Sequence, residues 1–124
     1  MEEWQLDFEW LRVRHLVKDS MNKKDLPDLQ SILYLIGIQE LGRWDGNQNF
    51  TKEEKQDLMH IAVCTLLEGE GYYIFQGRDQ DGWPHWKENN AFKISGLAEQ
   101  ERFLKEKVIG YFQGLDELEK DALK

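Results

Sequence analysis

Hydrophobic residues recur at helical spacing over four stretches of the chain, beginning with about Trp4 to Asn22. The apolar positions of this first stretch form two stripes, the first through Leu6, Trp10, Val13 and Val17 and the second through Trp4, Phe8 and Leu11. A helix buries an apolar stripe against a neighbouring element. Two stripes therefore predict a helix that contacts two neighbours.

The second stretch is the most apolar. Asp25 and Asp28 flank Pro27, a typical helix start, and apolar residues continue to Leu41 with little polar face between them. Gly42 is suited to end the helix, because glycine adopts the left-handed conformation of a C-cap. This pattern predicts a central, largely buried helix, followed by a loop over residues 43–50.

Two further helices are predicted in the second half of the chain. Thr51 and Glu54 have the spacing of a capping box, and the helix that they begin extends to about Glu68. Ser95 is a candidate N-cap for a last helix from about Leu97 to Gln113.

Between these two helices the pattern changes to that of strands. Residues 72–75 and 83–87 are rich in aromatic and β-branched side chains, and the polar turn from Arg78 to Gly82 separates them. Pro84 cannot donate to a strand ladder, so an ordered irregular loop is the alternative. The predicted fold class is mainly α: about four helices in a compact bundle, with a small β-hairpin or ordered loop at residues 72–87 between the third and fourth helices.

Length and charge restrict the function classes. The 124 residues are expected to form one globular domain, 1–124, with a tail from residue 116 that either frays or extends the last helix. The net charge of −8 argues against nucleic-acid binding, which needs a cationic face. We find no membrane span or export signal, and Cys64 is the single cysteine, so a cytoplasmic location is expected.

The aromatic stretch from Gly71 to Glu88 is the first candidate binding surface. Tryptophan, tyrosine and arginine commonly anchor protein interfaces. The predicted binding residues are Tyr73, Arg78, Trp83, His85 and Trp86. At least one of the two tryptophans is expected to keep an exposed face, although the rings could instead cover the helical core.

Glu40 leads to a second candidate. It falls on the apolar side of the second helix, where a carboxylate needs a hydrogen-bond or charged partner or takes up a proton. Burial with such a partner is therefore expected. A pocket between helices, formed by His15, Glu40, Asp57 and His60, is the alternative site.

Metal binding has weak support in the sequence. Asp57, His60 and Cys64 share one side of the third helix, and all three are zinc-ligand types, but neither HExxH nor CxxC occurs. Gly77–Glu88 resembles a calcium loop only in part, since glycine occupies its first position. We therefore expect no metal and no cofactor.

The chain as a whole resembles an uncharacterised family of small acidic cytoplasmic proteins from Bacteroidetes-type bacteria. The resemblance rests on LPDLQSILYLIGIQELG, FTKEEKQDLMHIAVC and GRDQDGWPHWK. It implies a bacterial, cytoplasmic protein and brings no activity, cofactor or catalytic residue.

These observations favour a non-enzymatic interaction or regulatory module that meets a protein partner through its aromatic hairpin. The alternative is a small-molecule or metal-dependent enzyme that uses the carboxylate and histidine pocket. No nucleophile stands in a catalytic motif, which speaks against the enzyme. The identity of the partner and the oligomeric state are left open.

Overall fold

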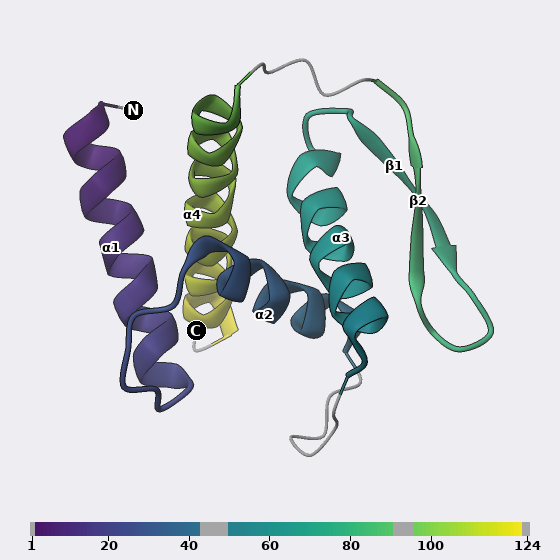
Figure 1. The fold of residues 1–124 in the computed structure, drawn as a ribbon, viewed down its shortest axis with the longest axis horizontal. Coiled ribbons are helices and arrows are strands. Elements are labelled where there is room, and N and C mark those ends of the chain that lie inside the picture. Colours follow the sequence, from purple (N-terminus) through teal and green to yellow (C-terminus); the bar gives the residue numbers. More distant parts are fainter. Residues whose placement is uncertain (1, 43–49, 91–95, 123–124) are drawn as a thin grey trace. The chain divides into compact units, whose positions relative to one another are not determined.

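A computed structural model of the chain describes residues 2–42, 50–90 and 96–122. In this part of the chain four helices and one hairpin follow in the order α1 (Glu3–Ser20), α2 (Leu29–Leu41), α3 (Lys52–Glu68), β1 (Tyr73–Arg78), β2 (Pro84–Glu88) and α4 (Leu97–Ala122) (Figure 1). The predicted fold class is confirmed in its helices and its hairpin. Residues 43–49 of the loop predicted at 43–50 and the Ser95 cap lie outside the described residues. Within the described ranges, no helix is long and apolar enough to cross a membrane.

The chain divides into two compact units, which are described separately. The first consists of residues 1–28 and 94–124 and contains α1 and α4. The second consists of residues 29–93 and contains α2, α3 and the hairpin. The expectation of a single domain stays a prediction.

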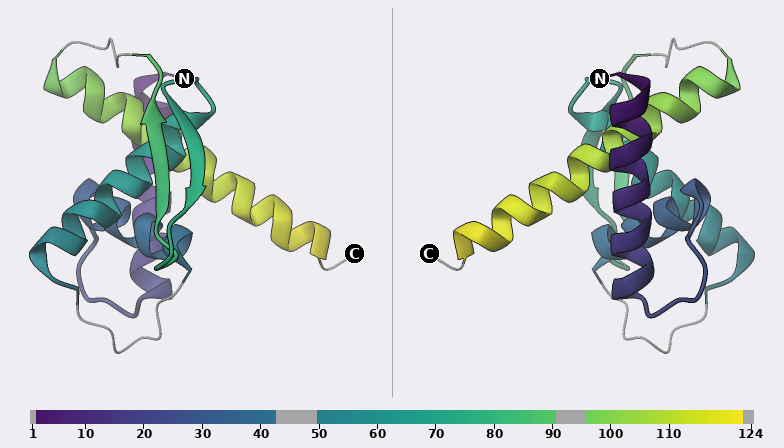
Figure 2. Two further views of the ribbon diagram at one scale, coloured as in Figure 1. Left: turned by 90° about the vertical axis from the view of Figure 1, so that its right-hand side faces the viewer. Right: turned by 90° about the vertical axis from the view of Figure 1, so that its left-hand side faces the viewer.

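In the first unit α1 and α4 contact each other and cross at an angle (Figure 2). Arg102 of α4 pairs with Glu3, and the Lys105 ammonium lies 5.5 Å from the centre of the Trp10 ring. The Nε of Arg14 donates a hydrogen bond of 2.8 Å to the carbonyl oxygen of Pro27 and so holds the segment that follows α1. Asn22, with φ of 53°, takes the left-handed conformation that ends a helix.

The two apolar stripes of α1 differ in burial. Leu6, Trp10, Val13 and Val17 are buried, as expected for a helix face that packs. The second stripe is not: Trp4 is 66% exposed and Phe8 63% exposed. The expectation that this stripe contacts a second neighbour is therefore wrong in the described structure.

In the second unit α2 and α3 form the most extensive helix contact. Gly37 is buried in α2, and a Cβ atom built on it would lie 2.0 Å from the carbonyl oxygen of Leu58 in α3. The two backbones thus approach more closely than any side chain at position 37 would allow. The capping box predicted for α3 is present, with Thr51 Oγ1 accepting from the Glu54 amide at 3.1 Å.

The hairpin is an antiparallel pair that begins at Tyr73↔Glu88 and ends at Arg78↔Pro84. Gly77, with φ of 102°, adjoins an irregularity in the register after Phe75. Pro84 is the first residue of β2, a position that tolerates the missing amide hydrogen. The hairpin is confirmed, and the alternative of an irregular loop is excluded.

A small core joins the helices to the hairpin within this unit. Its buried members come from α2, from α3 and from the residue just before α3, and they are Ile38, Leu41, Phe50, Leu58 and Ile61. The partly buried rings of Tyr34, Trp83 and Trp86 pack against these residues. Both tryptophans are half-buried. The hairpin is therefore anchored to the helices by its own aromatic rings.

Candidate functional site

A cleft of about 400 Å³ lies where the N-terminal half of α3 faces the turn of the hairpin. It is lined by Glu54, Asp57, His60, Ile61, Asp79, Trp83, Pro84 and His85. Two sets of residues that the sequence assigned to competing sites meet here. Asp57 and His60 come from the predicted carboxylate and histidine pocket, whereas Trp83 and His85 come from the predicted aromatic surface.

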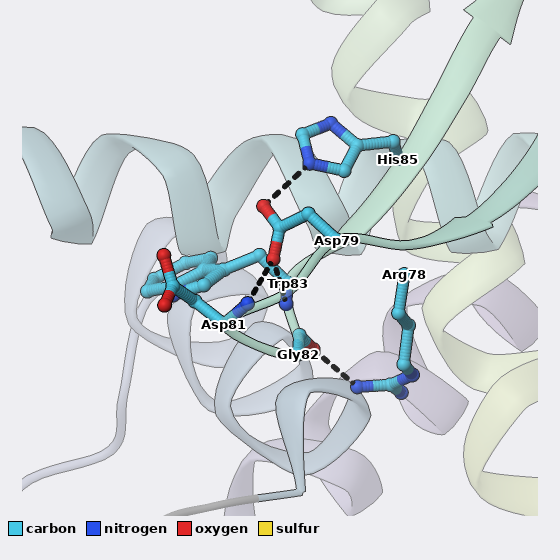
Figure 3. A network of polar contacts seen from close by, with 6 residues as sticks. All are labelled: Arg78, Asp79, Asp81, Gly82, Trp83 and His85. Carbon is cyan, nitrogen blue, oxygen red and sulfur yellow. Dashed lines mark hydrogen bonds and ion pairs between the residues drawn. The ribbon is translucent and has the colours of Figure 1, made fainter.

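Asp79 organises the turn that forms one wall of the cleft. Its Oδ1 accepts from the amides of Asp81 at 2.9 Å and Trp83 at 3.0 Å, which is the local bonding that favours aspartate in turns. Its Oδ2 lies 2.9 Å from Nε2 of His85 (Figure 3). One carboxylate thus fixes the turn and the orientation of a cleft histidine.

The same contacts determine the charge of Asp79. The hydrogen bond with His85 comes first, then that from the Trp83 amide, and together they hold the pKa of this carboxyl below its ordinary value. Asp79 is therefore anionic at neutral pH. The carboxylate is exposed, so this effect carries little weight for stability.

The α3 wall of the cleft presents Asp57 and His60, both of which are exposed. Among the described residues, Asp57 makes no hydrogen bond or ion pair. The His60 ring meets that of Tyr73 edge to face at 6.1 Å, and its Nε2 lies 3.5 Å from Sγ of Cys64. Tyr73 thus supports a cleft histidine from the neighbouring strand.

Cys64 lies behind this wall and is fully buried. Burial, reinforced by the nearby Glu68 carboxylate, raises the pKa of the thiol to about 11. The thiolate is the reactive form of cysteine, and it is scarce at neutral pH when the pKa is so high. Cys64 is accordingly a packed core residue and not a nucleophile of the cleft.

Arg78 does not enter the cleft. Its guanidinium donates to the carbonyl oxygens of Glu40 at 2.7 Å, Leu41 at 3.1 Å and Gly82 at 2.8 Å. These contacts satisfy the last carbonyl groups of α2, where a cation is favourable. The sequence predicted an interface role, but the guanidinium is engaged in joining the hairpin to α2.

The sequence predicted that at least one of Trp83 and Trp86 keeps an exposed face, and both are half-buried. Neither is among the large exposed hydrophobic residues of the described chain, whereas Ile74 is 49% exposed and Phe75 45% exposed. Trp83 lines the cleft while it packs against the core. The ring of Trp86 packs against that of Phe75 with centres 5.2 Å apart and planes tilted by 56°. Its indole nitrogen is buried without a hydrogen-bond partner in the described structure.

Glu40 and His15 do not line the cleft. Glu40 is half-buried and borders a second cavity of about 170 Å³, together with Thr65, Glu68 and Arg78 among others. His15 is exposed on α1 in the other unit. The four residues of the alternative pocket are thus divided, and only Asp57 and His60 meet.

Metal ligation finds no structural support in the described residues. No group of three or more acidic, histidine or cysteine side chains is arranged there to hold an ion. Asp79, the third position of the calcium-like loop, is committed to the hydrogen bonds of the turn.

The sequence did not assign Glu54 and Asp79 to a site. Glu54 was recognised only as the capping residue of α3, and one of its oxygens does serve that purpose at 2.9 Å from the Thr51 amide. Asp79 was placed in the polar turn. An aspartate early in a polar turn commonly accepts a hydrogen bond from the backbone amide two residues further on, in an Asx-turn. This tendency could have identified Asp79 as the organiser of the loop.

Comparisons with protein-family models, curated proteins and solved structures found no match. The resemblance to small acidic bacterial proteins therefore stays a prediction.

Proposed function

We propose that this chain is a non-enzymatic, cytoplasmic protein-interaction module whose partner docks at the cleft between α3 and the hairpin. The observation that carries the proposal is the convergence of Asp57 and His60 on one wall with Trp83 and His85 on the other. An open concave surface with an aromatic wall and a few polar groups is typical of recognition sites. The single cysteine supports a reducing compartment.

The roles of the hairpin residues divide under this proposal. Trp83, Trp86 and Arg78 hold the hairpin against the helices, and of these only Trp83 also faces the cleft. His85 and Asp57 are exposed and can contact a partner without supporting the fold.

Site-directed photo-crosslinking tests the proposal. A photoreactive phenylalanine analogue replaces His60 in the cleft, and a matched chain carries it at Lys55, which is exposed on the same helix but does not line the cleft. We expect a protein adduct from position 60 in the lysate of the source cells and none from position 55. Loss of the adduct in a His85→Ala chain, with helical content unchanged, would support the assignment.

Equal crosslinking from both positions would contradict the proposal, as would an adduct at position 60 that His85→Ala leaves unchanged. Either result would mean that the partner does not use the cleft.

One contact favours a second candidate function, acid–base catalysis on a small molecule. A carboxylate 2.9 Å from an imidazole is the arrangement that orients a general base, and Asp79 has this relation to His85. Among the described residues no serine, threonine or cysteine lines the cleft, so the function considered is proton transfer. Turnover that His85→Gln and Asp79→Asn both abolish, with crosslinking at position 60 absent, would favour the enzyme.

A further inference from the structure

The cleft carries negative charge on both of its walls. Glu54 and Asp57 project from α3, and Asp79 belongs to the hairpin turn. In the described part of the chain no lysine or arginine lines it. The contacts that keep Asp79 ionised also fix one of these charges in place. A cation between the walls would be attracted from both sides, whereas a phosphate or carboxylate would be repelled.

The cleft also presents hydrogen-bond acceptors in excess of donors. Asp57 has no partner among the described residues, so both of its oxygens can accept. His85 uses Nε2 toward Asp79, and its Nδ1 is left for another group. Glu54 commits one oxygen to the capping box and keeps the second. A ligand that satisfies this set must bring several donors.

Trp83 adds the third element, an aromatic ring in the lining of the same cleft. Aromatic rings attract cations to their faces, and the planar guanidinium of arginine both stacks on tryptophan and offers five donors. A lysine ammonium has only three donors and no plane to stack. Arginine therefore matches the ring and the acceptors better than lysine does.

We infer that the cleft binds an arginine side chain of the partner protein, with the guanidinium between Asp57 and Trp83. This inference rests on the proposed function and specifies the chemistry of the partner. The net charge of −8 would also speed the approach of a basic segment.

A titration followed by amide and indole NMR signals tests the inference. The probe is a capped Gly/Ser hexapeptide with one central arginine, and the matched peptide carries citrulline, which has nearly the same shape without the charge. We expect the signals of His60, Trp83 and His85 to shift, and citrulline to weaken binding by about tenfold or more.

Variants of the protein locate the binding site. Asp57→Asn removes one charge from the cleft, and we expect it to weaken peptide binding by about tenfold. Glu53→Gln removes the same charge one turn away, at an exposed position outside the lining, and should change affinity by less than about twofold. Equal affinity for the arginine and citrulline peptides, or equal effects of the two variants, would each overturn the inference.

The two hypotheses fail in distinguishable ways. A protein adduct at position 60 without arginine-dependent peptide binding would leave the interaction module in place and refute the cationic chemistry. Absence of both results would refute the docking site itself.

Discussion

The two helix pairs of the molecule are held in different ways. In α2 and α3 the backbones meet, with the Cβ position of Gly37 only 2.0 Å from the carbonyl oxygen of Leu58. In α1 and α4 the contacts include charged groups near the surface, such as the ion pair between Arg102 and Glu3, whose side chain is 70% exposed. Exposed ion pairs contribute little and tolerate change. Sensitivity to substitution should therefore concentrate in the pair formed by α2 and α3.

The largest effect is expected from Gly37→Ala. Its methyl group would overlap backbone atoms of α3, which cannot move aside as a flexible side chain does. We expect a loss of about 3 kcal/mol or more in the free energy of unfolding, measured by urea denaturation. Gly69→Ala is the control, because its φ of −62° is helical and nothing lies within 4 Å. A Gly37→Ala chain as stable as the Gly69→Ala chain would remove the basis of the comparison.

The stability of the protein at alkaline pH tests the burial of Cys64 in the pair formed by α2 and α3. The folded thiol ionises near pH 11 and the unfolded thiol near pH 9, so the folded state binds more protons between these values. The contribution of the thiol to the free energy of unfolding is fully present below about pH 9. It falls by about 2 to 3 kcal/mol as the pH rises to about 11. Burial also raises the pKa of Tyr34 and Tyr73, so the wild-type slope is compared with that of Cys64→Ala.

Denaturation at several pH values is the measurement. The wild type should lose stability more steeply than Cys64→Ala between pH 9 and 11. Parallel slopes would show that the thiol is not desolvated in the folded protein.

The smallest effect is expected in α4. Gly110 lies in the helix interior with no atom within 4 Å of its Cβ position. Gly110→Ala should raise the free energy of unfolding by about 0.5 to 1 kcal/mol, because alanine loses less backbone entropy in a helix. Gly42→Ala has equally open surroundings but a φ of +76°, and it should lose stability. A destabilised Gly110→Ala chain would show that this pair is also closely packed.

Local signals in the sequence predicted the elements of the fold. The capping box at Thr51 and the alternating aromatic residues around the polar turn each act over a few positions, and both are present in the structure. The close approach at Gly37 went unrecognised, although a glycine within an apolar helix can indicate such a contact. Its partner, Leu58, lies 21 positions away, beyond the range of periodicity.

The cleft could be predicted only in halves. The sequence nominated Asp57 and His60 for one site and Trp83 and His85 for another, because nothing local indicates that α3 faces the hairpin turn. The engagement of Arg78 with α2 was not predicted for the same reason, since its carbonyl partners Glu40 and Leu41 are close only in the folded unit. Tertiary contacts, which local patterns do not encode, decided all of these assignments.

The contacts of Arg78 have a consequence for the order of folding. The hydrogen bonds from Arg78 to Leu41 and Glu40 span 37 and 38 positions of the chain. The end of α2 therefore obtains them only after the hairpin has reached it. Contacts of long sequence separation form late, because closing the intervening loop costs entropy before any bond is gained. The helix and the hairpin should therefore complete their structure in a single cooperative step. The cleft between α3 and the turn would appear in that step, and no earlier intermediate would hold it.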